Sequence, residues 1–197
     1  MKTISSNTLL EQLQEDTRKL IYTAKQLDYC TPEMLEHKPA TGGWSVAQVL
    51  EHLDIYARYY LDAIEQKLHR NTTKPTHHFS PGWLGNYFTK LMLPRANKTI
   101  AKKMKAPKNA VPAEHPDGKA MLREFMQHQH RLLNLLQVAK TANIGKLRIA
   151  TSLSKLITLK LGDTFRFFIA HQQRHFLQVE RILAAFRKQN TCASAVS

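Results

Sequence analysis

Apolar residues recur at helical spacing in four long stretches of the chain. They lie three or four positions apart from Asn7 to about Leu27, from Gly43 to His69, from Asp117 to about Ala139 and from Asp163 to Phe186. Positions with this spacing fall on one face of a helix, and a globular protein buries that face. The pattern therefore predicts four amphipathic helices of roughly 20 to 27 residues each.

Residues that commonly cap helices stand where these stretches begin. Ser45 followed by Gln48 is a capping-box signature, which fixes the start of the second helix. Caps for the other three helices are expected from Ser5 or Ser6, from Asp117, and from Asp163 or Thr164 after Gly162. The apolar pattern is lost past Phe186, so we expect one bundle domain over residues 1–188 and a flexible tail over 189–197.

The stretch from Asn71 to His115 separates the second helix from the third and has a different composition. It holds five of the eight prolines of the chain. Within it, one short segment that ends at Pro94 places several apolar side chains on one helical face, namely Trp83, Leu84, Tyr87, Phe88 and Leu91. We expect a short helix here that packs against the bundle or against a second subunit. Later in the chain, Leu147 to Gly162 mixes β-branched and basic residues and predicts a partly extended connection.

These elements predict an all-α protein. Its fold class is a four-helix bundle with a long, loop-rich connection, including a short helix, between helices two and three. The first residues carry charges where a signal peptide has its apolar core, and no apolar run approaches the roughly 18 residues that span a bilayer. Cys30 and Cys192 form no close pair. A cytoplasmic location is therefore expected, with no transmembrane segment.

The chain is strongly basic, with 29 Lys and Arg against 15 Asp and Glu, a formal net charge of +14. Such a field favours anionic partners of any kind. The densest positive run, Arg95 to Lys108, contains no aromatic residues of the kind that stack on single-stranded nucleic acid. It is more typical of a solvated connector, and His77 and His78 nearby are expected to be exposed.

Two histidines of the fourth helix, His171 and His175, stand one helical turn apart. Residues at this spacing can grip one metal ion between two imidazoles. Three apolar residues fall near the same face, namely Phe168, Val179 and Ile182. Arg174 and Arg181 fall away from it. With ten histidines in 197 residues, however, about 0.5 such pairs arise by chance. The pair alone is weak evidence for a metal site.

A third histidine, His52, lies about two turns into the second helix on its apolar side. Taken alone it is better explained as a buried histidine that bonds a tyrosine hydroxyl or a backbone carbonyl. If the second and fourth helices pack side by side, however, His52 can meet His171 and His175. His128 and His130 stand only two positions apart on the third helix, so they cannot both join one cluster.

Three neutral imidazoles leave a divalent ion with its full charge and at least one open coordination position, as in catalytic sites. Residues within a turn or two of the ligands that could assist a reaction are Gln48, Tyr56, Tyr59 and Gln178. No glutamate accompanies the pair in the manner of an HExxH helix, which counts against peptide hydrolysis.

The combination of GWSVAQVLEHL with HQQRHFLQ resembles the DinB-like, or DinB and YfiT-like, superfamily of metal-dependent enzymes. The resemblance extends from the first helix to the fourth and includes Trp44 with Ser45, the His52–Leu53 pair, and Arg174–His175 with Gln178. It implies a four-helix bundle, often dimeric, in which His52, His171 and His175 bind a divalent ion such as zinc or nickel. It further implies thiol-dependent transferases or isomerases among the relatives.

From these observations we expect a metal-dependent enzyme that performs thiol-dependent S-transfer or hydrolase-like chemistry on a small molecule. A low-molecular-weight thiol is a candidate substrate, and a homodimer is a candidate assembly. The alternative is a non-catalytic basic helical bundle that binds nucleic acid or another anionic partner through residues 95–108 and the positive field. A third possibility is a metal site that stabilises the fold and has no catalytic role.

Overall fold

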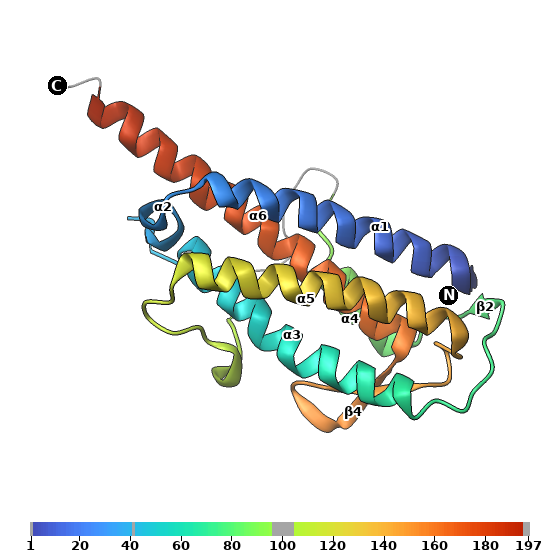
Figure 1. Cartoon of the computed structure of the whole chain (residues 1–197). Helices are drawn as coiled ribbons and strands as arrows, with labels where there is room; N and C mark the ends of the chain where they lie inside the picture. Colours follow the sequence, from blue (N-terminus) through green and yellow to red (C-terminus); the bar gives the residue numbers. More distant parts are fainter. Residues whose placement is uncertain (1, 41, 96–104, 195–197) are drawn as a thin grey trace.

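The computed structural model describes residues 2–40, 42–95 and 105–194. Its four long helices are α1 (Ser6–Lys25), α3 (Val46–His69), α5 (Gly118–Val138) and α6 (Leu161–Ser194), and Figure 1 shows them packed lengthwise. The predicted fold class is confirmed. The predicted connection also contains its short helix, α4 (Trp83–Met92).

Short elements join the long helices. They are the helix α2 (Pro32–Glu36) and the 3₁₀ helices η1 (Gln26–Tyr29), η2 (Lys108–Ala110) and η3 (Ala139–Thr141). Two antiparallel strand pairs complete the order, β1 (Ile4–Ser5) with β2 (His78–Phe79), and β3 (Arg148–Thr151) with β4 (Ser154–Lys160). The expected extended connection before the last helix is therefore a β-hairpin.

Side-chain caps start three of the long helices as the sequence predicts. Ser5 accepts a hydrogen bond from the Thr8 N–H, and Asp117 accepts one from the Ala120 N–H. Ser45 and Gln48 form the reciprocal capping box, at 3.2 and 3.1 Å. These caps satisfy backbone donors that the first turn of a helix leaves free, so they set where each helix begins.

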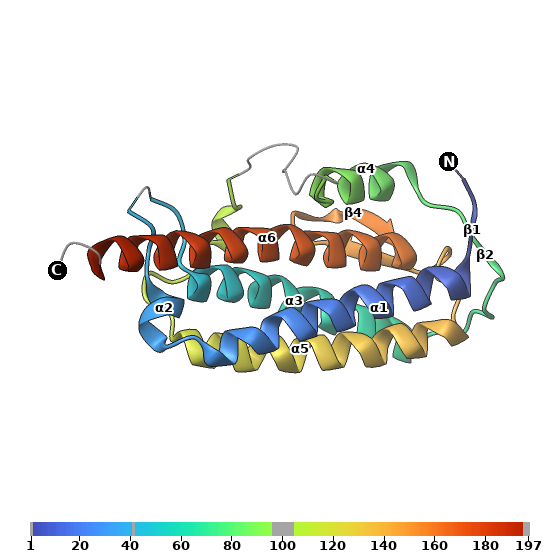
Figure 2. The same ribbon diagram turned by 90° about the horizontal axis from the view of Figure 1, so that it is seen from above.

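The four long helices pack in the cyclic order α1, α5, α3, α6. Figure 2 shows them from above, packed lengthwise. Each therefore contacts two neighbours and turns its apolar stripe to the centre. The largest fully buried side chains of this core include Leu10, Leu50, Leu53, Leu61, Leu122, Phe125, Phe165 and Phe168. No helix in the described ranges is both long and apolar enough to cross a membrane.

The start of α6 differs from the prediction. The helix begins at Leu161, and neither Asp163 nor Thr164 caps it. The Leu161 and Gly162 N–H groups instead donate to the carbonyls of Leu147 and Ile144, so backbone atoms replace a side-chain cap. Asp163 is buried and accepts a hydrogen bond from the Gly82 N–H at 2.7 Å, just before α4.

The far end of α6 also differs, because the helix continues past Phe186 to Ser194. The flexibility of the tail over residues 189–197 stays a prediction.

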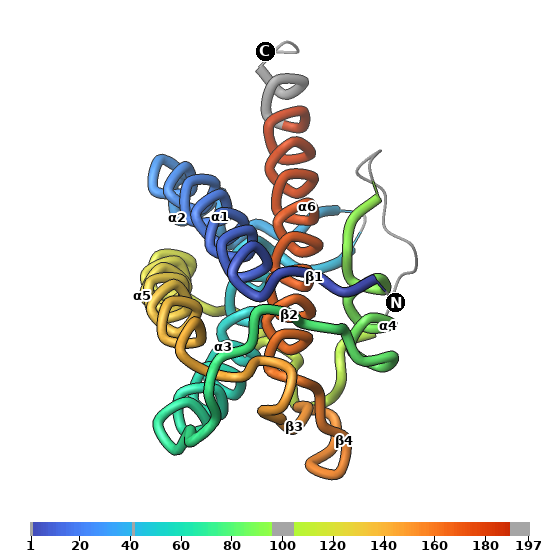
Figure 3. Tube along the Cα trace, turned by 90° about the vertical axis from the view of Figure 1, so that its right-hand side faces the viewer, coloured from blue at the N-terminus to red at the C-terminus, as the bar shows by residue number. Residues whose placement is uncertain are grey.

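The helix α4 and the β3–β4 hairpin lie outside the four-helix bundle, as the end-on view in Figure 3 shows. α4 packs along α6 and turns Gly85, Thr89 and Met92 inward. A Cβ at position 85 would lie 2.4 Å from Asp163, so glycine permits this close approach. These additions cover the part of α6 that carries the histidine pair.

Candidate metal centre

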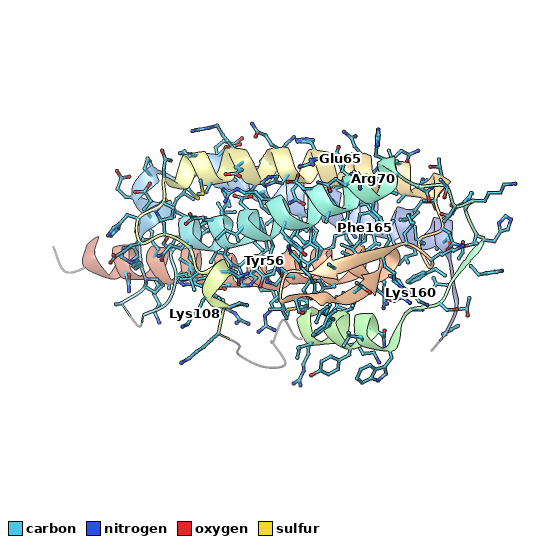
Figure 4. The ribbon with its side chains drawn as sticks, turned by 90° about the horizontal axis from the view of Figure 1, so that it is seen from below. Tyr56, Glu65, Arg70, Lys108, Lys160 and Phe165 are labelled. Atoms are coloured by element: carbon cyan, nitrogen blue, oxygen red, sulfur yellow. The ribbon has the colours of Figure 1, made fainter. Side chains whose placement is uncertain are left out.

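His52 of α3 meets His171 and His175 of α6 inside the bundle. One nitrogen atom from each imidazole can be chosen so that all three lie within 4.8 Å of one another. The ring centroids are 5.3 Å apart for His52 and His171, 4.8 Å for His52 and His175, and 4.6 Å for His171 and His175. Tyr56, which contacts His52 and His171, is labelled in Figure 4 at the place where α3 lies beside α6. The predicted convergence is confirmed, and this set could hold one metal ion.

Two of the three imidazoles have a fixed orientation. The Nδ1 atom of His52 lies 2.6 Å from the Ala110 carbonyl, and Nδ1 of His175 lies 3.0 Å from the Oε1 atom of Gln178. Both oxygens only accept hydrogen bonds, so each Nδ1 carries the proton and donates it. The Nε2 lone pair of each ring is then available to a cation, which is the usual way in which a metal-binding histidine is held.

The third imidazole, His171, is different because its buried Nδ1 atom has no hydrogen-bond partner in the part of the chain that the structure describes. An unsatisfied buried polar atom costs roughly 1 to 3 kcal/mol. The three-imidazole donor set fits a divalent cation, since imidazole suits zinc, nickel, copper and iron.

All three histidines are held in the neutral form that metal binding needs. His52 is 3% exposed and His171 is 4% exposed. Burial lowers the pKa of His52, and it lowers the pKa of His171 well below the usual range, with a further contribution from the nearby His175. Burial and the neighbouring His52 lower the pKa of His175 to about 3. A proton therefore does not compete with a metal ion at neutral pH.

Aromatic rings enclose the cluster. Trp44 lies 4.8 Å from the His52 ring, Tyr56 lies 4.7 Å from the His171 ring, and Phe167 lies 6.1 Å from His171, all measured between ring centroids. Phe167 precedes His171 by one helical turn, but no pattern in the sequence distinguishes it from the other core aromatic residues. These rings keep the surroundings apolar, which strengthens electrostatic interactions within the cluster.

A segment before α5 folds over the start of α3. The Ala110 carbonyl of this segment bonds His52, and the Ala113 N–H donates to Glu51 at 2.7 Å. Gln48 donates through Nε2 to the Ala113 carbonyl at 2.9 Å. Gln48 therefore anchors the segment that positions His52, while its role as a group that assists a reaction stays a prediction.

The other three candidate residues lie at different distances from the cluster. Tyr56 contacts His52 and His171, and Gln178 accepts the His175 proton, so both are adjacent to the proposed ligands. Tyr59 instead donates its hydroxyl proton to the Thr151 carbonyl at 3.1 Å and holds the β3–β4 hairpin. The structure places Tyr59 in a supporting position.

The burial of Arg174 is not apparent from the helical pattern of α6. The helical pattern places it away from the histidine face, yet it is only 7% exposed. Its guanidinium donates to the Leu91 carbonyl at the end of α4, so α4 covers a side of α6 that a bare four-helix bundle would leave to solvent. The Arg174 charge also helps to lower the pKa values of His171 and His175.

The remaining histidines lie elsewhere. His128 bonds Asp54 at 2.9 Å, whereas His130 bonds the Met126 carbonyl on the exposed side of α5, so the two diverge as predicted. His77 and His78 are exposed, also as predicted. Most of the basic run from Arg95 to Lys108 lies outside the described residues, namely positions 96–104.

The comparisons with known proteins agree with the helical-bundle fold. A family model described as the DinB superfamily matches residues 9–179, which is most of the chain. The chain belongs to the DinB superfamily. Among solved structures, this DinB-superfamily chain is similar to YfiT from Bacillus subtilis, with a TM-score of 0.53 and 16% identity over 96% of this chain and 92% of that one. No curated protein matches the chain in sequence.

YfiT is described as "a probable metal-dependent hydrolase with an unusual four-helix bundle topology". At this level of identity, the likeness shows a shared fold and does not transfer an activity.

Proposed function

We propose that His52, His171 and His175 bind one divalent metal ion and that the protein is a metal-dependent enzyme for a small-molecule substrate. The observation that carries the proposal is the convergence of three neutral imidazoles within 4.8 Å, two of them oriented by hydrogen bonds to oxygen acceptors. In the described part of the chain, one group of histidine, cysteine or acidic residues is placed so that it could hold a metal. It consists of these three histidines and contains no carboxylate.

Three protein ligands leave an open coordination position, which favours a catalytic site over a closed structural one. An ion held there would supply Lewis acidity, which would lower the pKa of a bound water toward about 7 or hold a substrate thiol as its thiolate. Hydrolysis and S-transfer by a low-molecular-weight thiol are therefore the two reaction classes to test. The description of YfiT supports the first, and the thiol-dependent relatives implied by the sequence resemblance support the second.

Residues around the cluster could contribute to such a reaction by donating a hydrogen bond, excluding water and orienting a ligand. Tyr56 contacts the His171 ring, and burial raises the pKa of its hydroxyl, which lies near Ser152, to about 12. The hydroxyl therefore stays protonated, and we propose that it donates a hydrogen bond to a bound substrate. The rings of Trp44 and Phe167 exclude bulk water. Gln178 holds the His175 ring in one orientation through its hydrogen bond.

Zinc and nickel are the ions we propose, because both accept three imidazole ligands and leave positions free. The substrate is proposed to be small because aromatic rings and the segment around Ala110 surround the cluster.

The deciding experiment is metal analysis by mass spectrometry of protein purified without a histidine tag. The parent is expected to hold about one ion per chain, and His52→Ala and His171→Ala are expected to hold little. His130→Ala is the matched control, since His130 lies on the exposed side of α5 and should leave the metal content unchanged. A parent that takes up no zinc or nickel on reconstitution would contradict the proposal.

A loaded parent would then be assayed on esters, amides and electrophiles, with and without small thiols. Activity on either class that is lost in His171→Ala supports catalysis. Tyr56→Phe tests the donor role, and we expect it to lower kcat about tenfold while the metal is retained. A loaded protein that loses its fold on chelation and turns over no substrate would instead indicate a structural metal.

A further inference from the structure

Exposed apolar side chains are concentrated in two neighbouring elements. Of the ten large apolar or aromatic side chains that are exposed in the described ranges, six belong to α4, to the residue after it, or to the β3–β4 hairpin. They are Trp83 (75% exposed), Tyr87 (53%), Leu93 (41%), Leu153 (61%), Leu156 (94%) and Ile157 (39%). Scattered exposed apolar residues need no explanation, but a cluster marks an interaction site.

The hairpin register places part of this set on a common surface. Along β4, side chains alternate between two faces, so Leu156, Thr158 and Lys160 point the same way, opposite to the buried Leu159. Arg148 pairs with Lys160 across the hairpin. A cavity of about 300 Å³ lies between this outer face and the start of α4, and its lining includes Trp83, Arg148, Thr158 and Lys160.

The lysine at the end of β4 ties the two elements together. The Lys160 ammonium donates to the Ser80 carbonyl at 2.6 Å, just before α4, and Figure 4 shows the Lys160 label between the hairpin and α4. Trp83 and Tyr87 stack on the outer side of α4, with ring centroids 6.3 Å apart. We call this surface the docking face and define it by Trp83, Tyr87, Lys90, Arg148, Leu156 and Lys160.

The docking face carries only positive charge. The sequence has no Asp or Glu between residues 66 and 113 or between 125 and 162, and these two stretches contain all of α4, β3 and β4. The nearby Asp163 is 1% exposed, and its carboxylate is bonded to Gly82 and Arg166. The face therefore presents aromatic and aliphatic side chains among cations, with no exposed carboxylate of its own elements to oppose an anion.

This composition favours an anionic lipid surface as the partner of the docking face, over a second copy of the chain or single-stranded nucleic acid. Two copies joined through this face would bring like charges together, which opposes a symmetric dimer. Single-stranded nucleic acid would need free aromatic faces on which bases can stack, but Trp83 and Tyr87 stack on each other, and Leu156 offers no ring. Lysine and arginine among tryptophan, tyrosine and leucine match a lipid headgroup layer with acyl chains beneath it.

We propose that α4 and the β3–β4 hairpin form a docking face for the surface of an anionic lipid bilayer, with Leu156 and Trp83 entering the boundary between headgroups and acyl chains. The inner side of α4 leads from this face to the metal centre. Phe88 contacts Phe167, and Phe167 contacts His171, with centroid distances of 6.0 and 6.1 Å. Docking would thus bring the metal centre close to the lipid surface, although docking itself does not depend on a metal.

The test is co-sedimentation of the full chain with vesicles of phosphatidylcholine alone and with roughly a third of phosphatidylglycerol. We expect retention only on the anionic vesicles, weakened by high salt. Leu156→Glu should lower the affinity roughly tenfold, since it replaces an inserting aliphatic group by an anion. At 94% exposure, this position tolerates the change without loss of fold.

Tyr29→Glu is the matched control, because it introduces the same charge at an aromatic residue that is 86% exposed elsewhere on the chain. It should retain most of the binding. Insertion is checked separately through quenching of tryptophan fluorescence by brominated lipids, which should be strong in the parent and lost in Trp83→Phe.

Three outcomes would overturn the proposal. One is the absence of binding to anionic vesicles at low salt. The second is an equal loss of binding in Leu156→Glu and Tyr29→Glu, which would indicate a diffuse charge effect. The third is a dimer, or a complex with a single-stranded oligonucleotide, that Leu156→Glu disrupts and Tyr29→Glu does not, which would assign the face to that partner.

Discussion

The helix α3 carries two buried polar groups that are built in different ways. Toward α6 it contributes His52 to a cluster of histidines that contains no acidic partner. Toward α5 it contributes Asp54, which is fully buried and accepts a hydrogen bond from His128 at 2.9 Å. Glu124 lies 3.8 Å from the other nitrogen of His128 and forms a two-point ion pair with Arg58.

The two groups differ in whether their polar atoms find partners of opposite character within the group. The α3–α5 group pairs acids with bases, and among the described residues the Oδ2 of Asp54 is left without a partner. The histidine cluster brings together three similar neutral donors with no acid among them, so a cation from outside would complete it. Buried histidines thus indicate a ligand site when several of them converge without an acidic partner.

The largest expected effect concerns His171→Leu. In the parent, a divalent ion at about 100 times its Kd should stabilise the fold by about 2.7 kcal/mol, which raises Tm by roughly 5 to 10 °C in a chain of this size. The variant should lose this response completely. Without metal, it should be about 1 kcal/mol more stable than the parent, because a buried unsatisfied nitrogen is removed. Calorimetry with and without zinc measures both effects.

A variant that keeps the metal response, and is less stable without metal, would show that His171 is a structural residue like His128.

The next effect concerns His128→Leu, which removes the hydrogen-bond donor from a carboxylate that is 0% exposed. We expect a loss of about 2 to 3 kcal/mol in the free energy of unfolding, measured in urea, with metal content unchanged. His130→Leu on the same helix is the control and should change stability by less than about 0.5 kcal/mol. Equal losses in both variants would contradict the pairing of Asp54 with His128.

The pH dependence of the two groups should have opposite signs. The pKa of His175 is lowered to about 3 in the folded protein, so on acidification only the unfolded chain takes up its proton, and stability falls below about pH 6.5. Between pH 7 and pH 5, the metal-free parent should therefore lose about 2 kcal/mol more than His175→Gln, measured by urea unfolding.

Asp54 provides the contrast. Burial raises its pKa to about 6, so its contribution to stability is present at low pH and is lost as the pH rises through about 6. Asp54→Asn should remove this term, which makes the variant lose more stability than the parent between pH 7 and pH 5. A parent and variant with parallel pH profiles would show that Asp54 titrates normally.

The smallest effect concerns Arg58→Gln, at the outer edge of the α3–α5 group. The Arg58 side chain is 49% exposed, so its ion pair with Glu124 is screened by solvent. We expect a loss of about 0.5 kcal/mol, which salt reduces further. A loss as large as that of His128→Leu would mean that the group acts as one network and not as a buried pair with an exposed edge.

The sequence predicted the helical elements well because the forces that form them are local. The capping box of Ser45 and Gln48 joins residues three positions apart, and the His171–His175 pair lies within one helical turn. The place of His52 in the cluster required an assumption about which helices are neighbours. The bundle pattern and the family resemblance supplied that assumption together, and the structure confirmed the resulting convergence.

Other features depend on segments that are distant in the sequence. Arg174 is buried only because α4 returns across α6, and the helical pattern of α6 contains no sign of this. Asp163 bonds Gly82 across 81 positions, whereas its local context predicted a helix cap.

The sequence by itself therefore determined four amphipathic helices, the starts of three of them, and a set of histidines suited to a metal, because periodicity and capping depend on neighbouring residues. Only the tertiary structure decided how the His52 ring is oriented, since the Ala110 carbonyl that holds it lies 58 positions away. The same is true of the docking face, which forms where α4 meets a hairpin from another part of the chain. Backbone carbonyls and contacts between distant segments leave no pattern in the local sequence.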